Sequence, residues 1–529
     1  MKRNLVSIFI TLLIGFIIYY FALPAINIHS FGFWVYLILL LSIYTITLLC
    51  SSIDEKGRII RSVKILIGSG VTIIVIILGI ILIDFIMSPL FHSKSYSERI
   101  SINETEEFTK NIAPVDFNKI PLLDKESSRK LGDRVMGQMP ELVSQFYVSD
   151  LYTQINYKDS IVRVTPLEYN GFFKYLSNKE DGVKGYITVN SVTGEANLVK
   201  LDKGMKYVPS AIFSKDLNRH LRFKYPTKIF GARNFEIDNE GNPYWIIPTI
   251  KYTAIGLKRE IASVIILDPI TGDSKEYKIG EVPSWVDHVY PADLIIEQVD
   301  DWGQYKDGFL NAIFGQKNVV QTTAGYNYMT MNDDVYLYTG ITSVSTDESN
   351  IGFILTNMRT KETNFYAVPG AEEYSAMDSA KGQVQQMNYD STFPLLINLN
   401  NRATYLLSLK DAAGLVKMYA FVDVADYQKV IITDSAKGIK TAADNYLNNV
   451  ELGANNQESI TKTIKIESIS QVSIDGTSYF YITDTEKQKY YVSIKANKNI
   501  LPFIKKEDNV EITYNDVKEV IEITNINLK

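Results

Sequence analysis

Three long apolar stretches stand at the start of this chain, whereas the rest of the sequence alternates between apolar and polar positions on a shorter scale. The stretches cover residues 4–23, 31–50 and roughly 65–87. Each approaches or exceeds the ~20 apolar residues with which a helix crosses a hydrocarbon layer ~30 Å thick. The pattern predicts three membrane-spanning helices and an anchor over residues 1–87. A cleaved signal peptide is disfavoured, because its apolar core would span only ~7–15 residues.

Basic residues in the short loops predict the orientation of this anchor. Lys2 and Arg3 precede the first span, and residues 24–30 contain neither Lys nor Arg. The second loop is basic, with Lys56, Arg58, Arg61 and Lys64. Because basic loops stay on the cytoplasmic side, the N-terminus is predicted to be cytoplasmic and residues after about 88 extracytoplasmic. Membrane lipid is the first partner that this pattern implies.

The one acidic residue of the spans is Asp84, near the outer end of the third. We interpret it as a side chain that reaches the membrane interface. The other spans offer no Lys, Arg or His partner within the bilayer, so a transport pathway is disfavoured.

After the anchor, the polar stretch 88–120 lacks a sustained period, which predicts a stalk. A helix-like segment followed by two hairpins then recurs. The predicted units are residues 121–205, 206–285, 286–368 and a degenerate fourth, 369–450. Alternating β-branched and aromatic residues favour half-buried strands, and an isolated hairpin is marginal in water. Each unit is therefore expected to fold one helix onto a sheet of about four antiparallel strands.

The turns of these units resemble those of a known family. Asp238, Gly241 and Tyr244 make a D-x-x-G-x-x-Y-like element. The second hairpin turns through Asn190, Thr193, Gly194 and Glu195 in the first unit, and through Asp268, Thr271, Gly272 and Asp273 in the second. This order resembles the PepSY and PepSY-like family, whose modules occur outside bacterial cells, beside membrane spans or as propeptide-type inhibitors of peptidases. The third unit departs from the pattern with Thr360-Lys361-Glu362, and the fourth has lost it.

The chain as a whole, with its membrane anchor, also resembles proteins of the colicin V production-like type. This resemblance implies little about chemistry. Residues 455–529 differ from the repeats and show five short β-like runs, with a turn at Gly476. They resemble an OB-fold, a small β-barrel. Ten Lys and ten Asp or Glu over residues 460–529 make this part neutral, which argues against nucleic acid as a partner. The fold class expected for the chain is thus α+β: three transmembrane helices, tandem helix-plus-sheet modules and a C-terminal barrel.

Cysteine usage fits a bacterial cell envelope. Cys50 is the single cysteine and falls at the predicted cytoplasmic end of the second span. The roughly 440 residues beyond the anchor therefore lack disulfides and must rely on packed cores.

Catalytic signals are mostly missing from the outer part. His92 falls in the predicted stalk, and His220 and His288 lie within units that carry neither H-E-x-x-H nor G-x-S-x-G. We interpret His220 as an exposed helix residue and His288 as a loop or interface residue. No catalytic residue, metal ligand or cofactor is expected.

Acidic stretches also have simpler explanations than catalysis. Residues 236–241 superficially resemble a calcium loop, but the twelfth position is Ile247 instead of a bidentate Glu. The pairs Asp300-Asp301 and Asp333-Asp334 are interpreted as solvated turns, because glycoside hydrolysis needs a second acid held across a cleft.

An aromatic cluster is the best candidate for a binding site. It comprises Trp245, Trp285, Tyr290, Trp302 and Tyr305. A sugar or peptide would stack on such a surface. The alternative is that these side chains pack the second unit against the third.

Together these features favour a non-enzymatic, membrane-anchored scaffold or sensor that binds a protein, peptide or glycan in the bacterial envelope. One alternative, implied by the PepSY resemblance, is an inhibitor or chaperone of a secreted or cell-wall peptidase. A second is a cell-wall enzyme that uses scattered carboxylates. The oligomeric state stays open.

Overall fold

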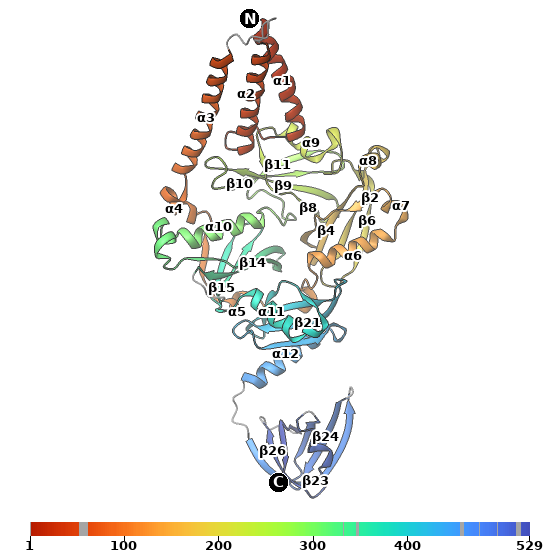
Figure 1. Ribbon diagram of the computed structural model, residues 1–529. Coiled ribbons are helices and arrows are strands. Elements are labelled where there is room, and N and C mark those ends of the chain that lie inside the picture. The colour runs from red at the N-terminus through yellow and green to blue at the C-terminus, as the bar shows by residue number, and fades with distance from the viewer. Residues whose placement is uncertain are drawn as a thin grey trace. The chain divides into compact units, whose positions relative to one another are not determined.

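The computed structural model describes residues 2–51, 62–331, 333–344, 349–454, 460–474, 477–494, 496–514 and 520–529. The chain divides into two compact units, Met1–Ala442 and Ala443–Lys529. Both combine helices with sheets, so the expected α+β class is confirmed at this level (Figure 1). Three basic residues used to predict the orientation, Lys56, Arg58 and Arg61, lie outside the described residues, as does the Gly476 turn.

The apolar stretches form the helices α1 (Lys2–Ala22), α2 (Phe31–Ser51) and α3 (Ser62–Ile86). All three are long and apolar enough to cross a membrane, as the sequence predicts. The Tyr36 hydroxyl of α2 donates to Gly15 O of α1 at 3.0 Å, and a Cβ at Gly15 would lie 2.5 Å from the Leu40 side chain. The glycine therefore lets α1 and α2 approach closely. The orientation of the helices stays a prediction.

Arg222 joins the anchor to the sheets. It lies in α9 (Leu217–Lys224), beside the C-terminal end of α1 in Figure 1. Its side chain is buried, and Nε donates to Leu23 O at 3.0 Å. The same guanidinium donates to three carbonyls after α9, those of Tyr225, Pro226 and Lys228. Carbonyls at a helix end lack partners within the helix, so one side chain here satisfies groups from both parts of the chain.

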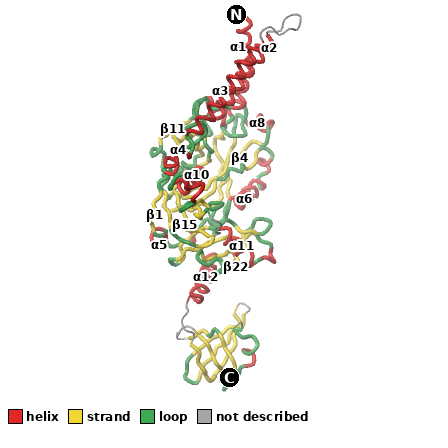
Figure 2. The backbone as a smooth tube through the Cα atoms, turned by 60° about the vertical axis from the view of Figure 1, so that its left-hand side comes forward, coloured by secondary structure: helices red, strands yellow, loops and turns green. Residues whose placement is uncertain are grey.

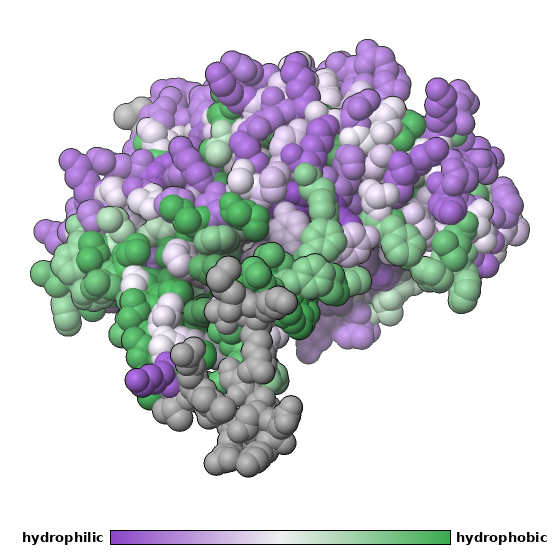
Figure 3. All heavy atoms as spheres, turned by 90° about the horizontal axis from the view of Figure 1, so that it is seen from above, coloured by the Kyte–Doolittle hydropathy of each residue, from purple (hydrophilic) through white to green (hydrophobic). Residues whose placement is uncertain are grey.

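A second junction holds the other two helices. The loop between β9 (Pro243–Lys251) and β10 (Glu260–Leu267) brings Ala254 O to 3.1 Å from His29 Nδ1, just before α2, and lets Ile255 N donate to Asp84 Oδ1 at 3.1 Å. Asp84 is thus bound to the folded region at the end of α3, and its place at the membrane interface stays a prediction. In Figure 3, apolar side chains gather around the anchor, and polar ones cover most of the remaining face.

Residues 88–120, expected to form a stalk, pack against the sheets instead. They contain α4 (Pro89–Ser97), β1 (Ile102–Glu106), α5 (Phe108–Asn111) and η1 (Phe117–Lys119), and β1 pairs in parallel with β16 (Thr363–Tyr366). The segment buries five apolar side chains: Tyr96, Ile100, Phe108, Ile112 and Ile120. They stand four or eight residues apart and belong to several short elements, so no single helix or strand pattern covers them.

An ionic network holds this segment in place. The Arg99 side chain is 1% exposed and contacts Glu260, Glu297 and Asp301, while its Nη2 donates to Arg259 O at 2.6 Å. Asp301 lies in α10 (Ala292–Tyr305), so the Asp300-Asp301 pair belongs to a helix rather than to a solvated turn. Asp300 accepts from Thr322 N at 2.8 Å.

Four mainly antiparallel sheets follow along the first unit. The first has the order β2-β4-β5-β6, with β3 on β4, and comprises β2 (Phe146–Val148), β3 (Thr153–Tyr157), β4 (Ser160–Tyr169), β5 (Val183–Asn190) and β6 (Ala196–Met205). The second has the order β11-β10-β9-β7, with β8 on β9, and comprises β7 (Ile229–Phe230), β8 (Asn234–Ile237), β9 (Pro243–Lys251), β10 (Glu260–Leu267) and β11 (Ser274–Lys278).

The third sheet has the order β1-β16-β15-β14-β12 and adds β12 (Val320–Thr322), β13 (Asn327–Met331), β14 (Asp334–Ser343), β15 (Ser349–Asn357), β16 (Thr363–Tyr366) and β17 (Gly370–Ala371). The fourth has the order β18-β20-β21-β22 and comprises β18 (Asp390–Ser391), β19 (Leu395–Leu399), β20 (Arg402–Lys410), β21 (Val416–Asp423) and β22 (Val430–Asp434). The remaining helices of this unit are α6 (Lys125–Gly137), α7 (Pro140–Val143), α8 (Phe172–Asn178), α11 (Glu373–Gln383), and the short η2 (Phe213–Lys215), η3 (Asn311–Gly315), η4 (Gln385–Met387) and η5 (Ser435–Lys437).

A single type of turn recurs in these sheets. The side chains of Asn190, Asp268 and Asn357 each accept hydrogen bonds from two backbone N–H groups that follow them. Gly194 and Gly272 close the first two turns with positive φ, and Lys361 adopts φ 65° in the third. The third turn therefore keeps the backbone geometry although its sequence departs from the glycine pattern.

The sheets share cores. Trp245 and Ile247 of β9 face a core built with the first sheet, whereas Ile246 faces a core built with α10 and the third sheet. Successive side chains of a strand point to opposite faces, so the continuous apolar run of β9 fits a strand covered on both sides.

The second unit includes most of α12 (Ile439–Ala454) and a six-stranded sheet of order β27-β25-β24-β23-β26-β28 (Figure 2). The long β23 (Ile460–Ile474) pairs with β26 through residues 460–465 and with β24 through residues 466–474, which gives a curled sheet. The other elements are β24 (Thr477–Asp484), β25 (Lys489–Ser493), η6 (Leu501–Phe503), β26 (Asn509–Tyr514), β27 (Val520–Glu522) and β28 (Asn525–Leu528). The OB-fold interpretation stays a prediction.

Arg222→Met should lower the free energy of unfolding by roughly 2–4 kcal/mol, because several partly buried hydrogen bonds from one guanidinium are lost together. Thermal unfolding of the full chain in detergent micelles measures the change. Arg129→Met is the matched control, since Arg129 is half exposed and lies 3.8 Å from Asp150, a surface pair of little value. Equal melting temperatures for the two variants would contradict the proposed junction.

Candidate functional site

The structure does not bring the five aromatic residues of the candidate patch together. Trp245 is fully buried, with Nε1 donating to Tyr207 O at 2.9 Å, and belongs to the core shared by the first two sheets. Trp285 and Tyr290 pack at the next core, where the Trp285 ring lies 5.1 Å from that of Tyr244. Trp285 and Tyr290 match the packing alternative, in which the second unit packs against the third, whereas Trp245 packs the first unit against the second.

Trp302 and Tyr305 lie on α10 and line a shallow hollow next to α4. The Lys306 ammonium lies 4.4 Å from the Trp302 ring, and the Tyr305 ring stacks on Phe309 at 6.3 Å. Of the five candidates, these two stay open to a ligand.

Both histidines of the predicted units are held by backbone carbonyls. His220 is half-buried, with Nε2 2.8 Å from Gly272 O, so it is less exposed than expected. His288 is buried, with Nε2 2.7 Å from Gln154 O, at a contact between the first and third sheets. The position of His288 matches the interface interpretation.

The most distinctive site is a pocket around Arg163, a residue that the sequence did not single out. We name it the Arg163 pocket; its volume is about 440 Å³. Its walls come from the segment before α6, from β13 and from the fourth sheet: Pro121, Leu122, Leu123, Asp124, Lys125, Glu126, Tyr326, Asn327, Tyr328, Thr392, Phe393, Leu395, Leu406 and Ser408.

Arg163 itself sits in the middle of β4. Val162 and Val164 face the core of the first sheet, so strand alternation turns Arg163 to the opposite face. That face is covered, and Arg163 is 6% exposed. No described residue accepts a hydrogen bond from its guanidinium, and Nε is buried without a partner. Burial lowers the pKa of Arg163 to about 10, so the group stays charged at neutral pH.

Its cross-strand neighbour is also unpaired. Gln154 of β3 is directly opposite Arg163 in the register, and both polar atoms of its buried side chain lack partners. Side chains so paired lie on one face of the sheet, about 5 Å apart at Cβ. Native proteins leave few buried polar groups unsatisfied, so two neighbours of this kind mark an unusual place.

The nearest acid is already engaged elsewhere. Asp124 caps α6 by accepting from Ser127 N at 2.9 Å, and it accepts from the buried Lys410 ammonium at 2.6 Å. Although burial alone would raise it, these hydrogen bonds hold the pKa of Asp124 below its ordinary value. Lys410 also pairs with Glu126 at 3.2 Å. Asp124 is therefore hydrogen-bonded to Lys410 and acts on Arg163 only through its charge, which favours the charged guanidinium.

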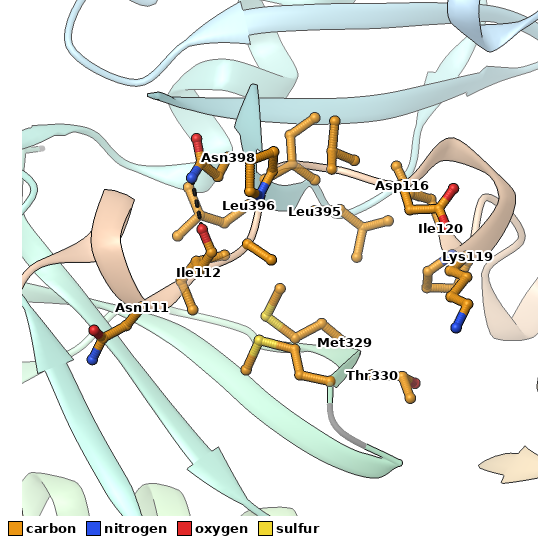
Figure 4. Close-up of a pocket in the computed structure, with 16 residues that line it drawn as sticks. Asn111, Ile112, Asp116, Lys119, Ile120, Met329, Thr330, Leu395, Leu396 and Asn398 are labelled. Atoms are coloured by element: carbon orange, nitrogen blue, oxygen red, sulfur yellow. Dashed lines mark hydrogen bonds between the residues drawn. The ribbon is translucent and has the colours of Figure 1, made fainter. Parts of the chain in front are cut away.

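A second cavity, of about 260 Å³, adjoins the Arg163 pocket and shares Pro121 and Leu395 with it. Figure 4 shows Met329 pointing into it from the third sheet, opposite Leu395 and Leu396. Asn398 closes one end by donating to Ile112 O at 2.6 Å. This cavity is mainly apolar.

A buried acidic pair lies close to the same junction. Glu236 of β8 is fully buried and accepts from the backbone N–H groups of Asp287 and His288, at 2.9 and 3.1 Å. Asp287 accepts from Asn156 N at 2.7 Å. Burial raises the pKa of Glu236 to about 7, and burial together with the Glu236 charge raises the pKa of Asp287. Burial lowers the pKa of His288 to about 4.

Other acids proposed as turns also have partners. Asp334 is held by Arg359 through two hydrogen bonds of 2.7 and 2.8 Å, and Asp333 accepts from Asn156 Nδ2 at 3.3 Å. Asp238 accepts from Glu240 N and Asn242 N in its hairpin turn, as the turn interpretation of residues 236–241 expects.

No protein-family model matches the sequence, and neither does any of the curated proteins compared with it.

Sequence reasoning did not single out Arg163, and it interpreted Glu236 only as part of a hairpin turn. Each stands among alternating residues of a hairpin, where a polar side chain normally faces water. The available signal was that Gln154 and Arg163 fall at facing positions of one predicted hairpin. The sequence does not indicate that another sheet covers this face.

Glu236→Gln should make stability less dependent on pH. The folded chain holds the Glu236 proton between the ordinary pKa of 4.5 and about 7, whereas the unfolded chain releases it, so the stability of the wild type falls as pH rises through this window. The free energy of unfolding of the variant should therefore rise relative to that of the wild type, by on the order of 2 kcal/mol, between about pH 5 and about pH 7.5.

The contribution of His288 to the pH dependence of stability has the opposite sign, because this residue takes up a proton below pH 6.5 in the unfolded chain and only near pH 4 in the folded chain. That contribution is present in both proteins and cancels in the comparison. Denaturant unfolding at the two pH values measures the effect, with Glu240→Gln, at an exposed position of the same hairpin, as control. A difference that stays constant with pH would refute the assignment.

Proposed function

We propose that this chain is a non-enzymatic membrane-anchored scaffold or sensor that binds a protein, peptide or glycan outside the cytoplasmic membrane of a bacterial cell. The observation that carries the proposal is the junction between anchor and sheets. The loop between β9 and β10 contacts His29 and Asp84, and Arg222 contacts Leu23. A change in the second sheet would therefore reach the ends of all three helices.

The repeated architecture supports a binding role. Each of the four sheets follows a helix in the chain, and the first three keep one turn geometry at Asn190, Asp268 and Asn357. We retain the PepSY-like interpretation of these units and the OB-like interpretation of residues 455–529 as parts of the proposal. Large sheets with shared cores offer rigid surfaces, on which loops position ligand contacts.

The histidines support a role without catalysis. His220 and His288, the histidines of the predicted units, each lie within hydrogen-bond distance of a backbone carbonyl, and burial lowers the pKa of both. The acidic pair Glu236 and Asp287 is buried away from the walls of the Arg163 pocket. The pocket residues that carry formal charge serve binding better than proton transfer.

Cross-linking in intact cells with a membrane-impermeant reagent tests the proposal. After purification of the full chain, we expect the same envelope protein, peptide or glycan in replicate samples, and its loss when the reagent is quenched before addition. Recovery of cytoplasmic components alone would contradict the proposed location. Turnover of peptidoglycan by the purified chain, abolished by one Asp or Glu substitution, would replace the proposal with a cell-wall enzyme.

A further inference from the structure

We propose that the Arg163 pocket binds the carboxylate group of a small organic molecule or of a peptide end. The inference deepens the proposed function by naming the ligand class of one site. It rests on the proposed function only in one respect, which is that the ligand is bound outside the cytoplasmic membrane.

The first argument is the unpaired charge. Arg163 is 6% exposed, lines the pocket, and donates to no described residue. The charge of Asp124 reaches Arg163 without a hydrogen bond between them, and a buried charged group without hydrogen-bond partners is costly. The planar guanidinium matches the two oxygens of a carboxylate, which accept parallel hydrogen bonds from it.

The second argument is that the carboxylates of the pocket walls are hydrogen-bonded to groups other than Arg163. Asp124 is bound by Lys410 and Ser127, and Glu126 is bound by Lys130 and Lys410. No ion pair of the described residues includes Arg163. A ligand carboxylate would supply the missing acceptor.

The third argument is charge, which favours an anion. The pocket walls carry Lys125 and Arg163 against Asp124 and Glu126, and Lys410 and Lys130, which pair with these two acids, add positive charge beside them. A carboxylate lowers the net positive charge of this group. A phosphate dianion would add negative charge beside Asp124 and Glu126, which like-charge repulsion disfavours.

The fourth argument is the shape of the walls. Tyr326, Phe393 and Leu406 give the pocket apolar and aromatic surface around its charged end. Burial raises the pKa of Tyr328, so its hydroxyl stays protonated. Apolar walls with a few convergent polar groups are typical of small-molecule sites, and a volume of about 440 Å³ falls in their range. The ligand class is therefore a carboxylate attached to a compact apolar or peptide body.

Thermal unfolding and calorimetry of the full chain in detergent micelles test the inference with four probes. Acetate represents a small carboxylate, trialanine a peptide end, trialanine amide the same peptide without its carboxylate, and inorganic phosphate the competing anion. We expect trialanine or acetate to bind and raise the melting temperature, and the amide and phosphate to have no effect. Binding of acetate would indicate a free small acid, and binding of trialanine alone a peptide end.

Arg163→Met should weaken the binding of the carboxylate probe by about tenfold or more. Without a probe, its melting temperature should equal or exceed that of the wild type, because an apolar side chain of similar size replaces a buried guanidinium without hydrogen-bond acceptors. Arg163→Lys, which keeps the charge but not the planar fork, should bind with intermediate affinity, and Arg129→Met should bind like the wild type.

Three results would overturn the inference. They are binding of phosphate alone, no response of the wild type to any probe, and a lower melting temperature of Arg163→Met with undiminished probe binding. All are read from the purified chain, so the inference can fail while an envelope partner exists, and the reverse also holds.

Discussion

The bilayer imposes the constraint on which the rest of this structure depends, because polar backbone and side-chain groups at the ends of the membrane-spanning helices must find partners at the border between lipid and water. Arg222 binds the backbone carbonyl of Leu23 at the end of α1, and the loop between β9 and β10 binds the side chains of His29 and Asp84 at the other two helices. The folded region supplies both sets of partners. The anchor and the second sheet are therefore parts of one packed body rather than a tether and its cargo.

The sheets also share packed surfaces with one another. A strand such as β9 serves two cores, with Trp245 on one side and Ile246 on the other, so neighbouring sheets stabilise each other. Covering both faces also encloses polar side chains that an isolated hairpin would leave in water. Glu236 is enclosed with backbone donors, whereas Arg163 is enclosed without an acceptor. Proteins tend to keep such locally unfavourable features where function requires them.

The sequence predicted the elements that depend on the length and the period of apolar runs. It missed the features that depend on which other elements cover a face of a sheet. The three anchor helices follow from apolar runs alone, and strands such as β9 and β10 follow from their alternation and their turns. Lys361 could not be recognised, since a lysine at positive φ looks like the loss of a glycine turn. The packing of residues 88–120 rests on single side chains such as Arg99, whose partners are distant in sequence. The aromatic candidates failed to converge, because nearness along the chain does not place Trp245 and Trp302 on one surface.

The central claim is that the anchor delivers this packed body to the outer face of the membrane. Labelling of intact cells with a membrane-impermeant maleimide tests it most directly, in a chain whose one native cysteine is removed by Cys50→Ser. Lys158→Cys places a thiol at an exposed position of the β3–β4 turn, and Lys56→Cys places one in the basic second loop. The account predicts that Lys158→Cys is labelled in intact cells and Lys56→Cys only after the cells are opened. The reverse pattern would contradict the account.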